Sequence, residues 1–344
     1  MIRVGLVGLP NAGKSTLFNF LTGALALVAP YPFSTVTPNK ANLKLYDKDA
    51  DALAAAVHAP DVLRTEVEVW DIAGLIAKAS EGEGLGNEFL GQIKDCQLLV
   101  HVLRADKTST AGSIQADSAT VLTEIALFDH KCLLKPFEKG RRLARLYPHD
   151  TAYARTNAVL SKAYYGTKEG QTVRAVLDPE DLAAVADLGL ISDKPRITLL
   201  NCGSAPDPSV GKLGDLTGNL LELATLVTMT EEDRAFLGYS SQPLYQFLQA
   251  YTEQLLAKTN SKRFYTVGHL GVGQWLVPRD ADAAACSQLV HAELGNAVKG
   301  VKVATLADFI HHGSWPTLTK QGAAKKYGPS YVPADRAVLY FEAT

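Results

Sequence analysis

The chain has 344 residues, of which 47% are hydrophobic and 20% are charged. This length predicts roughly two or three globular domains. The formal net charge of −2 excludes an overall basic surface, so contact with nucleic acid requires a local basic patch or a ribonucleoprotein partner, and no specific DNA partner is expected. The four cysteines form no C-x-x-C pair, and no apolar run reaches membrane-spanning length. We therefore expect reduced thiols, a cytoplasmic location and no membrane partner.

The apolar run Ile2–Val7 is typical of a buried parallel strand, and it leads directly into the loop Gly8–Ser15. This loop fits G-x-x-x-x-G-K-[ST], the phosphate-binding pattern of nucleotide hydrolases. Gly8 and Gly13 permit backbone angles that point successive N–H groups toward phosphate oxygens. The strand before the loop and the helix expected after it indicate a nucleotide site rather than a chance glycine turn.

Two side chains of this loop have direct chemical roles. Lys14 can reach the β- and γ-phosphates, and we expect it to act in catalysis. The Ser15 hydroxyl can hold Mg²⁺. The expected nucleotide-binding residues of this segment are Asn11, Ala12, Gly13, Lys14, Ser15 and Thr16.

Residues 29–39 contain several prolines and hydroxyl residues, which exclude a continuous helix and predict a loop. A loop that follows the phosphate-binding helix is where such hydrolases place the residue that senses the γ-phosphate. We predict that Thr35 supplies the second hydroxyl to Mg²⁺ and acts in catalysis, with Thr37 as the alternative.

The segment Glu66–Trp70 alternates polar and apolar residues and predicts a strand that ends at a D-x-x-G sequence, Asp71 to Gly74. Asp71 is expected in the Mg²⁺ shell, and the Gly74 N–H is expected to contact the γ-phosphate during catalysis. Leu75 occupies the position where many GTPases have a glutamine that orients the attacking water. We therefore expect slow intrinsic turnover.

A further buried strand is predicted over Gln97–Leu103. His101 lies in its apolar run, which favours a buried, hydrogen-bonded structural histidine over a catalytic one.

From about residue 118 to residue 190 the apolar spacing is typical of helices. This stretch contains the most basic cluster of the chain, for which a solvated helix face and a patch that faces RNA or the ribosome are both open. The cluster consists of Lys135, Lys139, Arg141, Arg142 and Arg145.

The predicted strand Pro195–Leu200 leads into Asn201, Cys202, Gly203 and Ser204, which are the expected base-side residues. GTP-specific proteins have N-K-x-D at this point, where the aspartate accepts two hydrogen bonds from guanine. Here Cys202 replaces the lysine and Ser204 replaces the aspartate. A serine lacks the charged, bidentate acceptor that selects guanine, so GTP specificity is disfavoured.

From residue 262 onward, short strands and turns predict a small α+β module. His311 and His312 are adjacent but lack a spaced carboxylate or cysteine, so they are weak evidence for a metal site. The expected domains are a discontinuous nucleotide-binding domain of residues 1–129 and 193–260, a helical insertion of residues 130–192, and the C-terminal module of residues 262–344.

Several of these stretches together resemble the Obg-like ATPase family, the YchF-type branch of P-loop proteins. The resemblance covers nearly the full length and is most specific over Asp71–Asn87. The matching stretches are Gly8–Phe18, Tyr31–Thr35 with Pro38 and Asn39, Asp71–Leu75, Ala79–Asn87, His101–Arg104, Trp275, Val290 with His291, Asp308–Ile310, and Tyr327–Phe341.

The resemblance implies an α/β fold with a doubly wound, mostly parallel sheet like that of G domains, a helical coiled-coil insertion and an α+β TGS domain. It also implies hydrolysis of ATP in preference to GTP, and association with the ribosome or its large subunit. Asn11 matches the loop asparagine with which related potassium-stimulated hydrolases coordinate K⁺, so the resemblance implies K⁺ stimulation in addition to Mg²⁺.

The chain departs from the family pattern at two points. The family has N-x-x-E at the base-reading site, where this chain has Ser204, and the segment Ala105–Asp117 lacks the histidine that the family places there. The leading hypothesis is a slow, ATP-preferring P-loop hydrolase. A nucleotide-gated binding module with little hydrolysis and a GTPase with non-standard guanine recognition are the alternatives, and a small-molecule kinase is the weakest.

Overall fold

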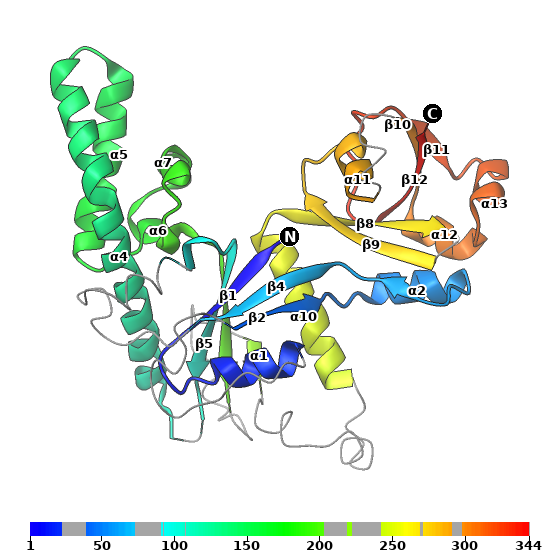
Figure 1. The fold of residues 1–344 in the computed structure, drawn as a ribbon, viewed down its shortest axis with the longest axis horizontal. Helices are drawn as coiled ribbons and strands as arrows, with labels where there is room; N and C mark the ends of the chain where they lie inside the picture. Colours follow the sequence, from blue (N-terminus) through cyan, green and yellow to red (C-terminus); the bar gives the residue numbers. More distant parts are fainter. Residues whose placement is uncertain are drawn as a thin grey trace. The chain divides into compact units, whose positions relative to one another are not determined.

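The computed structural model describes residues 1–22, 39–72, 91, 93–106, 108–202, 219–221, 242–268, 271–290 and 298–343 (Figure 1). The chain folds into two compact units. The first consists of Met1–Leu43 and Glu68–Asp233, and the second of Lys44–Val67 and Arg234–Thr344. Within the described parts, no helix combines the length and the apolarity needed to cross a bilayer.

The first unit is built on a six-stranded sheet with the order β2-β4-β1-β5-β6-β7. Its strands are β1 (Arg3–Val7), β2 (Asn39–Lys44), β4 (Glu66–Asp71), β5 (Leu98–Arg104), β6 (Arg196–Asn201) and β7 (Asn219–Leu221). β1 pairs in parallel with both β4 and β5, and the pairs β5–β6 and β6–β7 are also parallel. Because strand order reverses on either side of β1, ligands are expected at the carboxyl end of this strand. The predicted α/β fold of a P-loop protein is confirmed.

Apolar packing fixes the strands that carry the site. Every residue of β5 except Arg104 is buried, and so are the last four residues of β1. Helix α1 (Lys14–Thr22) follows the loop after β1 and buries Leu17 and Phe18. The loop between β1 and α1 is therefore held at both ends by buried elements.

Two long helices extend from this unit (Figure 1). They are α4 (Ala111–Leu146) and α5 (Thr151–Lys168), and the shorter α6 (Val173–Val176) and α7 (Pro179–Val185) pack beside them. The first half of α4 packs Val121, Ile125 and Phe128 into the core of the sheet. The second half has a separate apolar cluster, in which Leu133 contacts residues of α5 and α6. We call the distal part of this helix pair, residues 131–168, the helical arm.

Polar groups fix the start of α4 and the point where the chain returns to the sheet. Thr110 and Ser113 exchange backbone and side-chain hydrogen bonds at 2.9 and 3.1 Å, which caps the start of α4. Asp129, which is 1% exposed, accepts hydrogen bonds from the N–H groups of Ile191 and Ser192 at 2.8 and 2.7 Å. These bonds tie the returning chain to α4 before it enters β6.

The second unit contains another six-stranded sheet, with the order β11-β10-β12-β8-β9-β3. Its strands are β3 (Val62–Leu63), β8 (Ser261–Gly268), β9 (Gly271–Pro278), β10 (Val298–Ala304), β11 (Lys325–Tyr327) and β12 (Ala337–Ala343). Its helices are α2 (Lys48–Ala56), α10 (Gln242–Lys258), α11 (Ala283–Val290), α12 (Leu306–His312) and α13 (Trp315–Lys320). The segment Lys44–Val67, which contains α2 and β3, interrupts the first unit in sequence but belongs to this one.

The two faces of this second sheet are covered by different helices. On one face α11 packs against Phe264, Val301 and Leu339. On the other face α2, α12 and α13 pack against Tyr265, Ala304 and Val338. Alternate residues of β8, β10 and β12 therefore face opposite helix layers.

Candidate functional site

The loop Gly8–Gly13 joins β1 to α1, and its glycines are required by close contacts. A Cβ on Gly8 would lie 2.4 Å from the Val102 carbonyl oxygen, and one on Gly13 would lie 2.4 Å from Nδ2 of Asn201. Gly13 has φ +98°, and Asn11 has φ +62° with an exposed side chain. Only residues without a Cβ fit at the two glycines, so the path of the loop is fixed by β5 and β6.

Lys14 begins α1 and is only 6% exposed. Its ammonium group donates to the carbonyl oxygens of Gly8 and Leu9 at 3.2 and 3.0 Å, and therefore lies against the concave side of the loop. Burial lowers the pKa of Lys14 to about 8, although the charge of Asp71 opposes this shift. A polyphosphate bound in the loop would place negative charge beside Lys14. This charge would favour the protonated ammonium form of the side chain.

Asp71 ends β4 beside β1 and is 5% exposed. Its carboxylate accepts hydrogen bonds from the side chains of Ser15 and Asn39, whereas Oδ1 is buried and has no hydrogen-bond partner among the described residues. Burial raises the pKa of Asp71, and the Ser15 hydrogen bond and Lys14 oppose that rise. A buried carboxylate oxygen without a partner, next to a serine hydroxyl, is the donor set that Mg²⁺ prefers, so these residues fit the ion.

Asn39, the first residue of β2, is a site residue that the roles assigned from sequence did not include. It reaches Asp71 only because β2 and β4 are neighbours in the sheet. No spacing in the sequence signals this proximity.

Asn201 ends β6, Cys202 follows it, and the two side chains differ in what they contact. Nδ2 of Asn201 donates to the Ala12 carbonyl oxygen at 3.0 Å, which ties β6 to the phosphate loop. Cys202 is fully buried in an apolar cluster with Leu103 and Ala105. Its side chain is therefore directed into the core, and only its backbone can face a ligand.

His101 lies in β5 opposite Val7 of β1 and Thr198 of β6. It is 1% exposed, so its predicted burial is confirmed. The predicted hydrogen bond is not found, because neither ring nitrogen has a partner among the described residues. Burial, with the nearby charges of Arg196 and Lys14, lowers the pKa of His101 to about 3, so the ring is neutral at pH 7.

Several predicted site residues lie outside the described residues. They are Thr35, its alternative Thr37, Gly74, Leu75, Gly203 and Ser204. Of the other predicted residues, Ala12 is buried and Thr16 is half-buried within the same loop and helix. Lys14, Ser15 and Asp71 are brought together at the carboxyl edge of the sheet.

The basic cluster predicted from sequence lies on the outer half of α4, within the helical arm. Lys135, Lys139, Arg141, Arg142 and Arg145 are all exposed. Among the ion pairs of the described residues, none involves these five side chains, whereas Arg155 and Lys162 of α5 pair with Glu180 and Asp181 of α7. The cluster therefore presents five exposed cations, and Glu138, the carboxylate that lies among them on α4, forms no ion pair with them.

Family models match both ends of the chain. A model described as "50S ribosome-binding GTPase" matches residues 3–132, and a model of the C-terminal region of YchF GTPases, described as a protein of unknown function, matches residues 262–344.

Curated relatives match over almost their whole length. The ribosome-binding ATPase YchF of Haemophilus influenzae is 30% identical over 364 residues, which is 98% of this chain and 98% of the relative. The protein of the same name from Bacillus subtilis is 28% identical over 362 residues, which is 99% and 98% of the two chains. The solved structure of the Schizosaccharomyces pombe YchF GTPase is 21% identical, covers 99% of this chain and 97% of its own, and has a TM-score of 0.77. That likeness shows the shared fold.

Proposed function

Because this chain belongs to the YchF family of P-loop nucleoside-triphosphatases, we propose that it hydrolyses ATP slowly and in preference to GTP. We further propose that it does so in the cytoplasm as a regulatory protein of the ribosome or its large subunit, in line with the names of its relatives.

The observation that carries the proposal is the convergence of Lys14, Ser15 and Asp71 around the phosphate loop. Attack of water on a γ-phosphate depends on positioning and on neutralising charge, and there is little covalent chemistry for the protein to perform. The loop amides and Lys14 bind and neutralise the β- and γ-phosphates. Ser15 and Asp71 would hold Mg²⁺, which neutralises the same oxygens when it is bound. In the proposal, Thr35 adds a second hydroxyl to Mg²⁺ and the Gly74 N–H contacts the γ-phosphate.

The preference for ATP rests on the base side of the site. Ser204 offers no carboxylate to guanine, and the buried Cys202 side chain cannot replace it. Asn201, the one residue that matches the guanine-reading pattern, uses Nδ2 to hold the Ala12 carbonyl. The relatives from Haemophilus influenzae and Bacillus subtilis are also named as ATPases.

Potassium is part of the proposal through Asn11. This residue of the phosphate loop has an exposed side chain and a left-handed backbone, so its amide oxygen can coordinate a cation beside a bound phosphate. A K⁺ ion held there would neutralise phosphoryl charge in place of a finger arginine.

Association with the ribosome is assigned to the helical arm. Exposed, unneutralised cations attract a polyanion by releasing its counterions, and Arg141 and Arg145 lie one helical turn apart on α4. The patch interpretation of the basic cluster is therefore preferred to the solvated-face interpretation.

The nucleotide proposal is tested by equilibrium binding of labelled ATP and GTP with Mg²⁺ and K⁺, followed by phosphate release from the same samples. Tighter binding and slow release of phosphate from ATP support it. Lys14→Ala is expected to abolish binding or turnover, and Lys168→Ala, an exposed lysine of α5, is the matched control. Tight ATP binding without phosphate release above the Lys14→Ala background identifies a nucleotide-gated module instead. A preference for GTP overturns the argument from Ser204.

The ribosomal proposal is tested by co-sedimentation with large ribosomal subunits at two salt concentrations. The double variant Arg141→Glu/Arg145→Glu should lose binding. The control Lys162→Glu/Lys168→Glu changes the same charge elsewhere on the helical arm and should retain it. If both double variants lose ribosome binding equally, the loss is explained by the change in net charge. That result would reject the assignment of binding to Arg141 and Arg145.

A further inference from the structure

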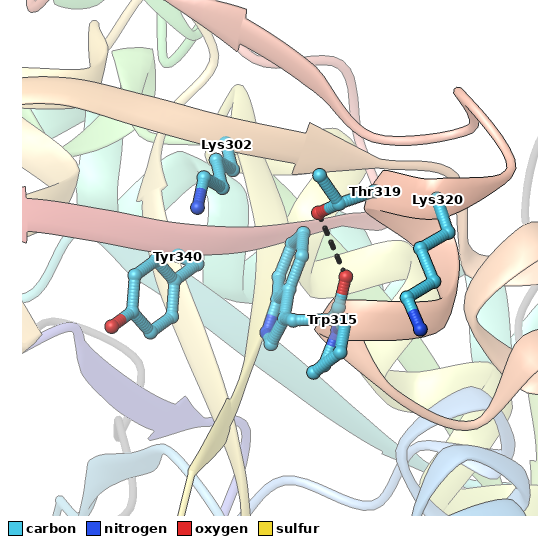
Figure 2. A pocket seen from close by; sticks show the side chains of 6 residues that line it. Lys302, Trp315, Thr319, Lys320 and Tyr340 are labelled. Carbon is cyan, nitrogen blue, oxygen red and sulfur yellow. Dashed lines mark hydrogen bonds between the residues drawn. The ribbon is translucent and has the colours of Figure 1, made fainter.

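A hollow of about 400 Å³ opens beside α13 in the second unit (Figure 2). It is lined by Lys302, Trp315, Pro316, Thr319, Lys320 and Tyr340. From this hollow we infer a further site, which binds single-stranded RNA through base stacking and phosphate contacts.

The hollow exists because the helix layer stops short of the end of the sheet. Ala304 and Val338 lie under α12 and α13, in contact with Phe309 and Leu318. Two residues further along their strands, on the same face, are Lys302 and Tyr340. Tyr340 is 46% exposed, so this part of the face is open to solvent.

Two neighbouring aromatic rings, Trp315 and Tyr340, lie at this point. Trp315 packs edge-on against Phe309 with ring centroids 5.0 Å apart, which holds the indole from inside the unit. The Tyr340 ring lies 5.7 Å from the indole centroid and is tilted by 55° to it. The Lys302 ammonium lies over the Tyr340 ring, 5.5 Å from its centroid. Figure 2 shows the indole with Tyr340 to one side and Lys320 to the other. A flat ring can stack on one of these two rings beside the Lys302 ammonium, with little loss of side-chain freedom.

Cations surround the rings in excess of carboxylates. The register pairs Lys302 with Lys326 on one side and with Tyr340 on the other, which makes a row across three strands. Glu342 forms an ion pair with Lys302 at 3.2 Å and another with Lys326. Lys320 has no ion pair with any described residue. Three lysines against one glutamate give this face a charge of +2.

The ligand must therefore combine a flat apolar ring with negative charge. A nucleotide has both, and in single-stranded RNA the unpaired bases are free to stack on aromatic side chains while the backbone meets the lysines. A duplex does not fit, because its ring faces are already stacked on one another. The row of cations continues from the hollow to the edge strand β11 at Lys326, which suits a chain of nucleotides better than a single one.

The test measures binding of fluorescein-labelled uridine and adenosine oligomers of about ten nucleotides, without a terminal phosphate, to the full chain by anisotropy. The protein carries Lys14→Ala so that the phosphate loop does not compete for the ligand. Tyr340→Ala should weaken binding by about fivefold or more, since stacking is worth about 1–3 kcal/mol per base. Tyr340→Phe should retain the affinity. Lys302→Ala should reduce the dependence of affinity on salt by about one phosphate contact.

Matched controls distinguish this site from the helical arm. Tyr165→Ala removes a tyrosine of α5 that is 56% exposed, and it should leave binding unchanged. Loss of binding in Arg141→Glu/Arg145→Glu without loss in Tyr340→Ala would overturn the inference and leave the ribosomal proposal intact. Equal competition by poly-glutamate or by free mononucleotides would also overturn it. So would the absence of binding by the full chain that carries Lys14→Ala as its only change.

Discussion

Nδ2 of Asn201, at the end of β6, donates a hydrogen bond to the carbonyl oxygen of Ala12 in the phosphate loop at 3.0 Å. The same nitrogen occupies the space that a side chain on Gly13 would need. The residue that resembles a base-reading asparagine therefore also sets the shape of the loop that is expected to hold the phosphates. Nucleotide affinity should depend on this contact.

Asn201→Ala should weaken ATP binding by about fivefold, because one hydrogen bond is worth about 1 kcal/mol. Asn201→Asp should weaken it further, because a carboxylate oxygen would then face the Ala12 carbonyl oxygen. Titration calorimetry measures both affinities. Asn157→Ala, on α5, is the control, and an unchanged ATP affinity in Asn201→Asp would contradict the role of this contact.

ATP affinity should fall as the pH rises above about 8. Lys14 has a lowered pKa of about 8 in the free protein, and a bound polyphosphate raises it by favouring the ammonium form. Above that pH, binding must therefore take up a proton, and the affinity should drop by up to about tenfold per pH unit until the pKa of the bound state is reached. Below pH 8 this group contributes no pH dependence.

Proton uptake on binding is measured directly by calorimetry in two buffers that differ in ionisation enthalpy. Lys14→Arg supplies the control, because a guanidinium does not titrate between pH 7 and pH 10. The ATP affinity that this variant retains should therefore not change with pH. An affinity of the unchanged protein that is constant from pH 7 to pH 10 would contradict the lowered pKa of Lys14.

Asp71→Asn should remove most of the benefit of Mg²⁺ while leaving the fold intact. The amide keeps the shape of the side chain but lacks the charge of the unpartnered Oδ1. We expect ATP affinity in Mg²⁺ to fall about tenfold, toward the value in EDTA, and phosphate release to fall at least as much. The charge of Asp71 also raises the pKa of Lys14, so the pH at which ATP affinity begins to fall should move downward. Asp187→Asn, on the surface of the first unit, should change none of these values.

The second unit should depend on a buried arginine. Arg263 in β8 is 1% exposed, forms a hydrogen bond with Glu253 at 2.7 Å, and lies 3.4 Å from Asp47, which caps α2. Arg263→Met leaves the buried Asp47 carboxylate without its cation. We expect a loss of about 3–5 kcal/mol in the free energy of unfolding of this unit, measured by denaturant titration.

The matched control is Arg155→Met, because Arg155 pairs with Glu180 on the surface, where both side chains are more than half exposed. Its loss should stay below about 1 kcal/mol. The double variant Arg263→Met/Asp47→Asn should recover part of the stability that Arg263→Met loses. A double variant less stable than the single one would contradict the view that an uncompensated Asp47 is the cause.

The sequence predicted the phosphate loop, Lys14 and Asp71 because each lies in a short pattern that directly follows an apolar strand. Contiguous residues share one local conformation, so their spacing is enough to place them at the end of that strand. The strands β1, β4, β5 and β6 and the helical character of residues 118–190 followed from the apolar pattern in the same way. The strands β2 and β3 were not predicted.

Other features were decided by tertiary structure alone. Asn39 reaches Asp71, Asn201 holds Ala12, and Lys44–Val67 joins the C-terminal unit, where β3 pairs with β9. Each of these depends on pairing between strands that are distant in the chain, and no local spacing records such pairing. The opening beside Trp315 and Tyr340 has the same origin, because it exists only where a helix layer ends before the sheet beneath it.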